Sequence, residues 1–126
     1  MTAVTGSLRC ELFPDDLDVA VAFYTGVLRF GVVRDERSAP APYVALRRGD
    51  VHLGLAARPT PQDVSPRRPP TGVELVLEVD DLTADHAHVR ATGWPLAEDL
   101  TDRPWGLRDF RLLDPHGYYW RVTTRG

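Results

Sequence analysis

One tryptophan stands out as a side chain that could recognise a ligand. Trp105 lies between Pro104, whose ring fixes its own φ angle, and Gly106, which tolerates φ angles that other residues resist. These neighbours predict that the indole is held on a stiff, sharply bent corner. A large flat side chain beside a sheet can stack on a flat molecule. The pattern therefore favours the binding of a planar compound.

Nucleophilic chemistry finds less support. Cys10 is the only cysteine, so an internal disulfide is excluded, and its apolar strand neighbours indicate a core residue rather than a reactive thiol. Ser7, Ser38 and Ser65 lie near the chain start or in predicted loops, and none belongs to a nucleophile elbow. The sequence has no glycine-rich phosphate loop. We therefore assign no catalytic residue.

The composition is typical of a single globular domain that spans residues 1–126. Of the 126 residues, 43% are hydrophobic and 26% are charged, and the net charge of −3 argues against nucleic acid as the main partner. No apolar run approaches the roughly 20 residues that span a bilayer. The first residues lack the features of a secretory signal. We expect a cytoplasmic protein with no nucleic-acid or membrane partner.

The chain is built from two halves of similar design. Asp15-Asp16-Leu17 and Asp80-Asp81-Leu82 each predict the start of a helix, because acidic residues there cap the free backbone N–H groups. Gly31 and Gly93 are the candidate stops. Alternating apolar strands precede and follow each helix. The order β-α-β-β-β, twice, predicts module one at 7–57, a proline-rich linker at 58–71 and module two at 72–124.

The second half ends in a predicted hairpin. In the run Asp114-Pro115-His116-Gly117, the aspartate caps the backbone, the proline presets one φ angle and the glycine accepts another that is unusual. The strands that it joins are expected at 110–113 and 118–123. A turn at 47–50 joins two strands of the first half in the same way.

These features resemble the vicinal oxygen chelate superfamily, which includes glyoxalases, extradiol dioxygenases and bleomycin-resistance proteins. The resemblance rests on the paired halves, on the helix at Asp16–Tyr24 and on the ending Pro104-Trp105-Gly106 … Asp114-Pro115-His116-Gly117, and it is closest to the bleomycin-resistance-type drug-binding proteins. It implies an α+β fold in which two βαβββ modules form a curved mixed sheet, a cup with the helices outside. It also implies a homodimer with a ligand in each cup.

In the enzymes of that superfamily a divalent metal sits in the cup, and the resemblance identifies the corresponding positions here. They are Arg9, Glu74, Arg121 and either His52 or Gly54 on the strand at 51–55. Arginine offers only hydrogen-bond donors and cannot ligate a cation. We therefore expect no metal and no cofactor. We expect Arg9, Glu74 and Arg121 to form a cation–carboxylate network in its place, although these could also be ordinary charges on a solvated face.

The period-two alternation assigns the strand residues to faces. It places Arg9, His52, Glu74 and Arg121 on the side of the cup. The expected core positions are Leu8, Cys10, Leu12, Val51, Leu53, Leu55, Val73, Leu75, Leu77, Tyr118, Trp120 and Val122.

The cup would be lined by aromatic rings and a few charges. The expected ligand-binding residues are Arg9, Phe13, Tyr43, His52, Glu74, Trp105, Phe110, Tyr119 and Arg121. The resemblance then implies a metal-free protein that sequesters an aromatic natural-product antibiotic, such as a bleomycin-, mitomycin- or enediyne-like compound, and so confers self-resistance. The small net charge and the two arginines favour a weakly charged aromatic compound.

Three alternatives remain open at this stage. One is a metal-dependent lyase or dioxygenase of the glyoxalase type, with donors from Glu11, His52, Glu74 and Glu78. Another is a metal-free enzyme that uses Glu74 or His52 for acid–base catalysis. Trp105 could also pack at the seam of the dimer.

Overall fold

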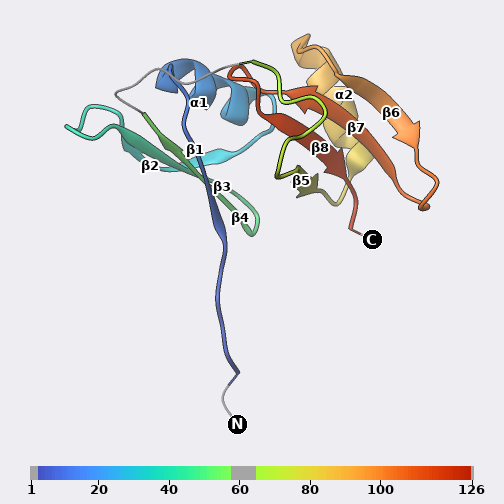
Figure 1. The fold of residues 1–126 in the computed structure, drawn as a ribbon, viewed down its shortest axis with the longest axis horizontal. Coiled ribbons are helices and arrows are strands. Elements are labelled where there is room, and N and C mark those ends of the chain that lie inside the picture. Colours follow the sequence, from blue (N-terminus) through green and yellow to red (C-terminus); the bar gives the residue numbers. More distant parts are fainter. Residues whose placement is uncertain (1–2, 58–64, 126) are drawn as a thin grey trace.

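The computed structural model describes residues 3–57 and 65–125, and it shows the same order of elements twice (Figure 1). The first module comprises β1 (Arg9–Leu12), α1 (Leu17–Gly26), β2 (Gly31–Glu36), β3 (Tyr43–Arg48) and β4 (Val51–Ala56). The second comprises β5 (Leu75–Glu78), α2 (Leu82–Thr92), β6 (Glu98–Asp102), β7 (Arg108–Leu113) and β8 (Tyr119–Thr123). The predicted β-α-β-β-β repeat is confirmed.

Each module forms a mixed four-stranded sheet with the same topology. Sheet A has the strand order β1-β4-β3-β2, and sheet B has the order β5-β8-β7-β6. The first strand of each module pairs in parallel with the last one, β1 with β4 and β5 with β8, and the remaining pairs are antiparallel. The two sheets lie side by side, and the segment before β1 projects away from them (Figure 1). The α+β class predicted from the sequence is confirmed.

The helix starts follow the predicted caps. Asp16 accepts a hydrogen bond from the backbone N–H of Val19, and Asp81 accepts one from that of Ala84. Gly93, with φ 79°, ends α2 in the left-handed conformation as expected. The expectation for Gly31 was wrong, because α1 ends at Gly26 and Gly31 opens β2 instead.

The two modules share one hydrophobic core. The ring of Tyr24 on α1 meets that of Trp120 on β8 at 5.8 Å between centroids, and Phe23 meets Trp94 at 4.9 Å. The Tyr24 hydroxyl donates to Asp114 Oδ2 at 2.5 Å and accepts from Trp120 Nε1 at 3.0 Å. These hydrogen bonds thus connect α1 of the first module to the reverse turn at 114–117 of the second.

The alternation predicted most core positions but not the strand ends. Leu53, Leu55 and Leu77 are buried as expected. Leu8 and Val73 are instead 89% and 71% exposed. Both precede the first residue of their strands, where no ladder aligns the side chain with the core face.

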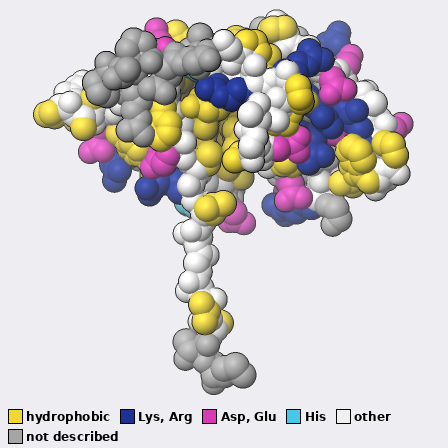
Figure 2. Space-filling view, in the orientation of Figure 1, with side chains coloured by type: hydrophobic (Ala, Val, Ile, Leu, Met, Phe, Trp, Pro, Cys, Tyr) yellow, Lys and Arg dark blue, Asp and Glu magenta, His cyan; other side chains and the backbone are white. Residues whose placement is uncertain are grey.

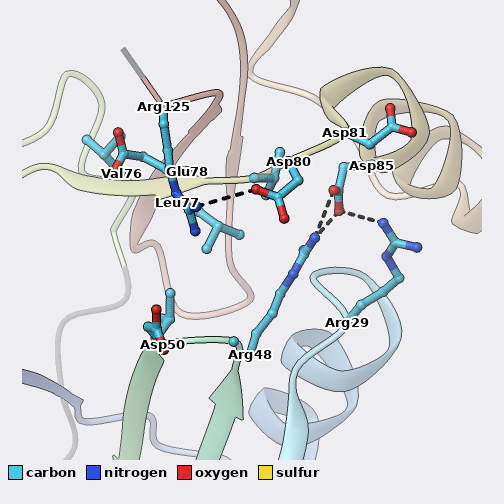
Figure 3. Close-up of a pocket in the computed structure, with 13 residues that line it drawn as sticks. Arg29, Arg48, Asp50, Val76, Leu77, Glu78, Asp80, Asp81, Asp85 and Arg125 are labelled. Atoms are coloured by element: carbon cyan, nitrogen blue, oxygen red, sulfur yellow. Dashed lines mark hydrogen bonds and ion pairs between the residues drawn. The ribbon is translucent and has the colours of Figure 1, made fainter.

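An ion-pair cluster also joins the modules (Figure 3). The buried carboxylate of Asp85 on α2 lies 2.8 Å from Arg48 Nη2 and 2.9 Å from Arg29 Nη2, both in the first module. Burial raises the pKa of Asp85, but the hydrogen bonds from Arg48 and Arg29 outweigh it and hold the pKa below the ordinary value. The cluster borders a hollow of about 610 Å³ that none of the expected ligand-binding residues lines.

The linker is described only in part, because residues 58–64 lie outside the described residues. After them, the Arg67 backbone N–H donates to Gly117 O, and the guanidinium lies over the ring of Tyr118 at 4.3 Å. The division into 7–57, 58–71 and 72–124 remains a prediction. Within the ranges 3–57 and 65–125, neither helix is both long and apolar enough to cross a membrane.

Candidate functional site

Each sheet has one face that packs in the core beneath the helices and one that does not, which we call the helix-free face. On sheet B, Phe110 pairs with Val122 and points to the core, whereas Arg111 pairs with Arg121 and points away from it. Tyr119 and Asp109 share this second face with them. The predicted face of Arg121 and Tyr119 is therefore confirmed by the register.

The helix-free face of sheet A carries a second group of expected residues. Arg9 is in register with His52 on β4, and Glu11 is in register with Gly54. Tyr43 on β3 reaches the same face, two ladder steps from Ala45, which is in register with Gly54. The strand pairing thus brings Arg9, Tyr43 and His52 to one face.

Glu11 is the centre of that group. Its Oε1 accepts a hydrogen bond from Arg9 Nε at 2.9 Å, and both carboxylate oxygens accept from the Tyr43 hydroxyl at 3.1 Å. Gly54 leaves the necessary space, because a Cβ there would meet the Glu11 carboxylate and the Tyr43 hydroxyl. Burial and the neighbouring Glu11 carboxylate raise the pKa of Tyr43. The sequence interpretation named Glu11 as an alternative metal ligand and did not predict its pairing with Arg9, although the i, i+2 spacing of the two residues favours this contact.

A separate ion pair lies on sheet B. Arg121 Nη2 is 2.7 Å from Glu74 Oε1, and both side chains are partly exposed. Arg121 Nε is buried, and within the described residues it has no hydrogen-bond partner. The predicted pairing of Glu74 with Arg121 is therefore present.

The expected network of Arg9, Glu74 and Arg121 does not form in the structure. Arg9 pairs with Glu11 on its own strand, and its side chain is 62% exposed. The reason is topological: Arg9 belongs to β1 in sheet A, whereas Glu74 and Arg121 belong to the β5–β8 side of sheet B. Each arginine therefore forms an ion pair with a carboxylate of its own sheet.

The sequence interpretation did not predict a larger ionic network on the same face of sheet B. The buried carboxylate of Asp109 accepts from Arg103 at 2.8 Å and from Arg111 at 3.2 Å. Burial raises the pKa of Asp109, but these guanidiniums outweigh it and hold the pKa below its ordinary value. Arg111 Nη1 donates to the Tyr119 hydroxyl at 3.1 Å. Figure 2 shows acidic and basic side chains intermingled over the half of the molecule that module two forms.

Asp109 and Arg111 could have been paired from their i, i+2 spacing, because Asp109 directly precedes the strand predicted at 110–113. Arg103 could not, because it precedes the turn that carries Trp105 and approaches only when the chain folds back. That turn is closed by the Arg103 N–H, which donates to Leu107 O at 2.8 Å. Glu98 on β6 completes the network through Arg103, at 3.2 Å.

The turn presents Trp105 to the solvent. Its side chain is 57% exposed, and Gly106 adopts φ 90° beside it, as the sequence predicts. Trp105 and Arg121 line the same hollow, which has a volume of about 410 Å³. The other residues that line it are Val76, Glu78, Leu107, Thr123 and Thr124. The exposed indole of Trp105 therefore shares one hollow with the guanidinium of Arg121 on sheet B.

The expectation that Phe110 lines the cup was wrong. Its side chain is fully buried, and its ring lies 5.4 Å from that of His86 on α2, on the opposite face from Arg121. Phe110 is next to Arg111 on β7, and neighbouring side chains of a strand point to opposite faces of the sheet. Phe110 therefore points into the core, whereas Arg111 lies on the helix-free face. Phe13, just after β1, is partly buried, and its backbone N–H donates to the Tyr118 hydroxyl.

Comparison with known proteins agrees with this architecture. The model of the Glyoxalase/Bleomycin resistance protein/Dioxygenase superfamily matches residues 6–122. The chain belongs to this superfamily. No curated protein matches it.

Several solved structures share the superfamily fold with this chain. TioX from Micromonospora sp. ML1 is 24% identical, with a TM-score of 0.76 and coverage of 95% of this chain and 98% of TioX. A bleomycin resistance determinant encoded on the transposon Tn5 is 25% identical, with a TM-score of 0.73 and coverage of 96% and 98%. TnmS3, an antibiotic binding protein from Streptomyces sp. CB03234, is 21% identical, with a TM-score of 0.77 and coverage of 100% of both chains.

The residues of this superfamily member do not fit the divalent metal of the related enzymes. Two of the implied ligand positions hold Arg9 and Arg121, whose guanidiniums have no lone pair to offer a cation. In the part of the chain that the structure describes, no group of three or more His, Cys, Asp or Glu side chains could hold a metal ion. We therefore derive no step that uses a metal.

Proposed function

We propose that this superfamily member is a metal-free binding protein that sequesters an aromatic natural-product antibiotic and so confers self-resistance. One observation carries the proposal. Arg121 stands at an implied metal-ligand position, is paired with Glu74 and lines a hollow with the exposed indole of Trp105. A guanidinium and an indole offer hydrogen bonding and stacking to a planar ligand, but no Lewis acid.

The surrounding carboxylates support binding rather than acid–base catalysis. Glu11 accepts from Arg9 and Tyr43, and Glu74 lies against Arg121. A carboxylate that is already engaged by donors of its own sheet is suited to holding those donors in place for a ligand.

The similar structures support an antibiotic as the ligand. One is a bleomycin resistance determinant and another is an antibiotic binding protein. Bleomycin-, mitomycin- and enediyne-like compounds are the classes that we propose to test. The net charge of −3 is small, and Arg121 lies in the hollow, so a weakly charged aromatic compound fits better than a strongly cationic one.

Fluorescence titration tests the proposal. Binding of an intact aromatic antibiotic should be saturable and should quench tryptophan emission, and Trp105→Ala should abolish the tight binding. Trp94→Phe is the matched control, because Trp94 packs against Phe23 and donates to Leu113 O away from the hollow. The compound should be recovered unchanged. A chemically altered compound, or stoichiometric transition metal in protein purified without chelator, would favour the lyase or dioxygenase alternative.

We also propose that the chain binds its ligand as a homodimer. The projecting segment before β1 and the start of module two expose large apolar side chains, Val4, Leu8 and Val73. Contact with a second copy would remove this apolar surface from water. Light scattering coupled to gel filtration should give twice the mass of one chain, and a single-chain mass at micromolar concentration would refute this part of the proposal.

A further inference from the structure

Arg121 differs from Arg103 and Arg111, the two arginines that bind Asp109 on the same face of sheet B. Arg103 contacts Asp109 and Glu98, and Arg111 contacts Asp109 and the Tyr119 hydroxyl. Within the described residues, Arg121 has a single contact of this kind, the ion pair with Glu74. A guanidinium has several N–H donors in a planar fork, so one carboxylate contact leaves hydrogen-bonding capacity unused.

That unused capacity borders a surface suited to a flat ring. Arg121 lines the hollow with Trp105, and Val76 and Leu107 add apolar surface. Val76 is in register with Arg121, so the valine side chain lies beside the arginine on the neighbouring strand. Val76 and Trp105 are both exposed. A ring placed over these side chains would have its edge at the guanidinium.

Glu78 supplies the opposite charge in the same hollow. It lies two residues after Val76 on β5, on the same face and roughly 7 Å further along the strand. Its exposed side chain has no ion pair or hydrogen bond within the described residues, and Arg125, which borders the larger hollow with it, pairs with Asp80. The hollow therefore offers a donor at one end and an acceptor at the other.

We infer that Arg121 and Glu78 select the ligand by its two edges. An acceptor oxygen, carbonyl or phenolate, faces Arg121, a hydroxyl or amino donor faces Glu78, and the aromatic ring between them covers Val76 and Trp105. This inference rests on the proposed function and narrows its ligand class. The separation of the two charges suits a fused ring system, and their opposite signs disfavour a ligand with a large net charge.

Four ring-matched probes test this selection: 2-aminoanthraquinone with both groups, anthraquinone with the acceptors only, 2-aminoanthracene with the donor only, and anthracene with neither. The wild type should bind 2-aminoanthraquinone most tightly. Arg121→Gln should weaken the two carbonyl probes by about tenfold or more, because hydrogen bonds to charged groups are strong, and should leave the other two unchanged. Glu78→Gln should weaken only the two amino probes.

Matched variants separate binding from folding. Arg108→Gln and Glu36→Gln remove exposed charges outside the hollow and should alter no affinity. Arg121→Lys keeps the charge beside Glu74, so it should fold if Arg121→Gln does not, and it should still weaken the carbonyl probes because the planar fork is lost. Melting temperatures of all variants should stay close to that of the wild type.

The outcomes distinguish the two proposals. If Trp105→Ala weakens all four probes, but Arg121→Gln and Glu78→Gln leave their order of affinity unchanged, the edge selection is wrong while the binding function stands. If no probe or antibiotic shows saturable binding, both proposals fail.

Discussion

Asp85 on α2 and Arg48 at the end of β3 meet at 2.8 Å, so a carboxylate of module two holds the hairpin of module one. Arg29 binds the other oxygen of the same carboxylate at 2.9 Å. The carboxylate is buried, whereas the two guanidiniums are partly exposed. This cluster and the shared core around Tyr24 are contacts between the two modules. Together they hold the two sheets in position relative to each other.

Asp85→Asn should therefore destabilise the protein by about 3 kcal/mol, because it leaves two guanidiniums beside a neutral amide. The free energy of unfolding in urea measures this loss. Asp102→Asn is the control: Asp102 is exposed and pairs with Arg108, so its loss should be below about 1 kcal/mol. Equal effects of the two substitutions would show that the cluster does not stabilise the fold.

The same pair predicts a pH dependence. The pKa of Asp85 is lower in the folded protein than its ordinary value of 3.8, so the unfolded chain binds the proton more tightly. The stabilisation is complete above the ordinary pKa and is lost as the pH falls below it. The difference in unfolding free energy between wild type and Asp85→Asn should shrink as the pH falls below about 4, whereas a constant difference would contradict the assignment.

Gly54→Ala should disturb the group around Glu11 with little loss of stability. The new Cβ would meet the ends of the Glu11 and Tyr43 side chains, which can move, so the cost should stay below about 1.5 kcal/mol. Displacing the carboxylate should lower the raised pKa of Tyr43 toward 10, as followed by tyrosinate absorbance. Gly26→Ala is the control, because a Cβ there meets nothing within 4 Å. An unchanged titration would refute the Glu11–Tyr43 contact.

Tyr24→Phe should destabilise the protein by about 1–3 kcal/mol, because the lost hydroxyl leaves Trp120 Nε1 without its acceptor and Asp114 Oδ2 without its donor. Burial already raises the pKa of Asp114, and the hydrogen bond from Tyr24 opposes that shift. The pKa of Asp114 should therefore rise further in the variant, measurable by carboxyl NMR titration. Tyr43→Phe, at a half-buried site, should cost less than about 1 kcal/mol, and a loss as large as that of Tyr24→Phe would contradict this account.

Much of the local structure could be predicted from the sequence because its causes lie within a few residues. Asp16 and Asp81 cap helices through their own side chains, and the turn at 114–117 closes by hydrogen bonds to Asp114. The faces of Arg121 and His52 followed from the period of two. Leu8 and Val73 show the limit of that rule, because alternation has a direction only where a neighbouring strand holds the backbone.

The sequence by itself therefore determined the repeated modules, their caps and turns, and the replacement of implied metal ligands by Arg9 and Arg121. Only the tertiary structure decided which groups meet. Arg9 and Arg121 fall on different sheets and take different carboxylates, and the chain reversal at Trp105 brings that indole to the hollow of Arg121. The physical reason is range: caps and alternation act over a few residues, whereas ion pairs and hollows depend on how strands distant in sequence are packed together.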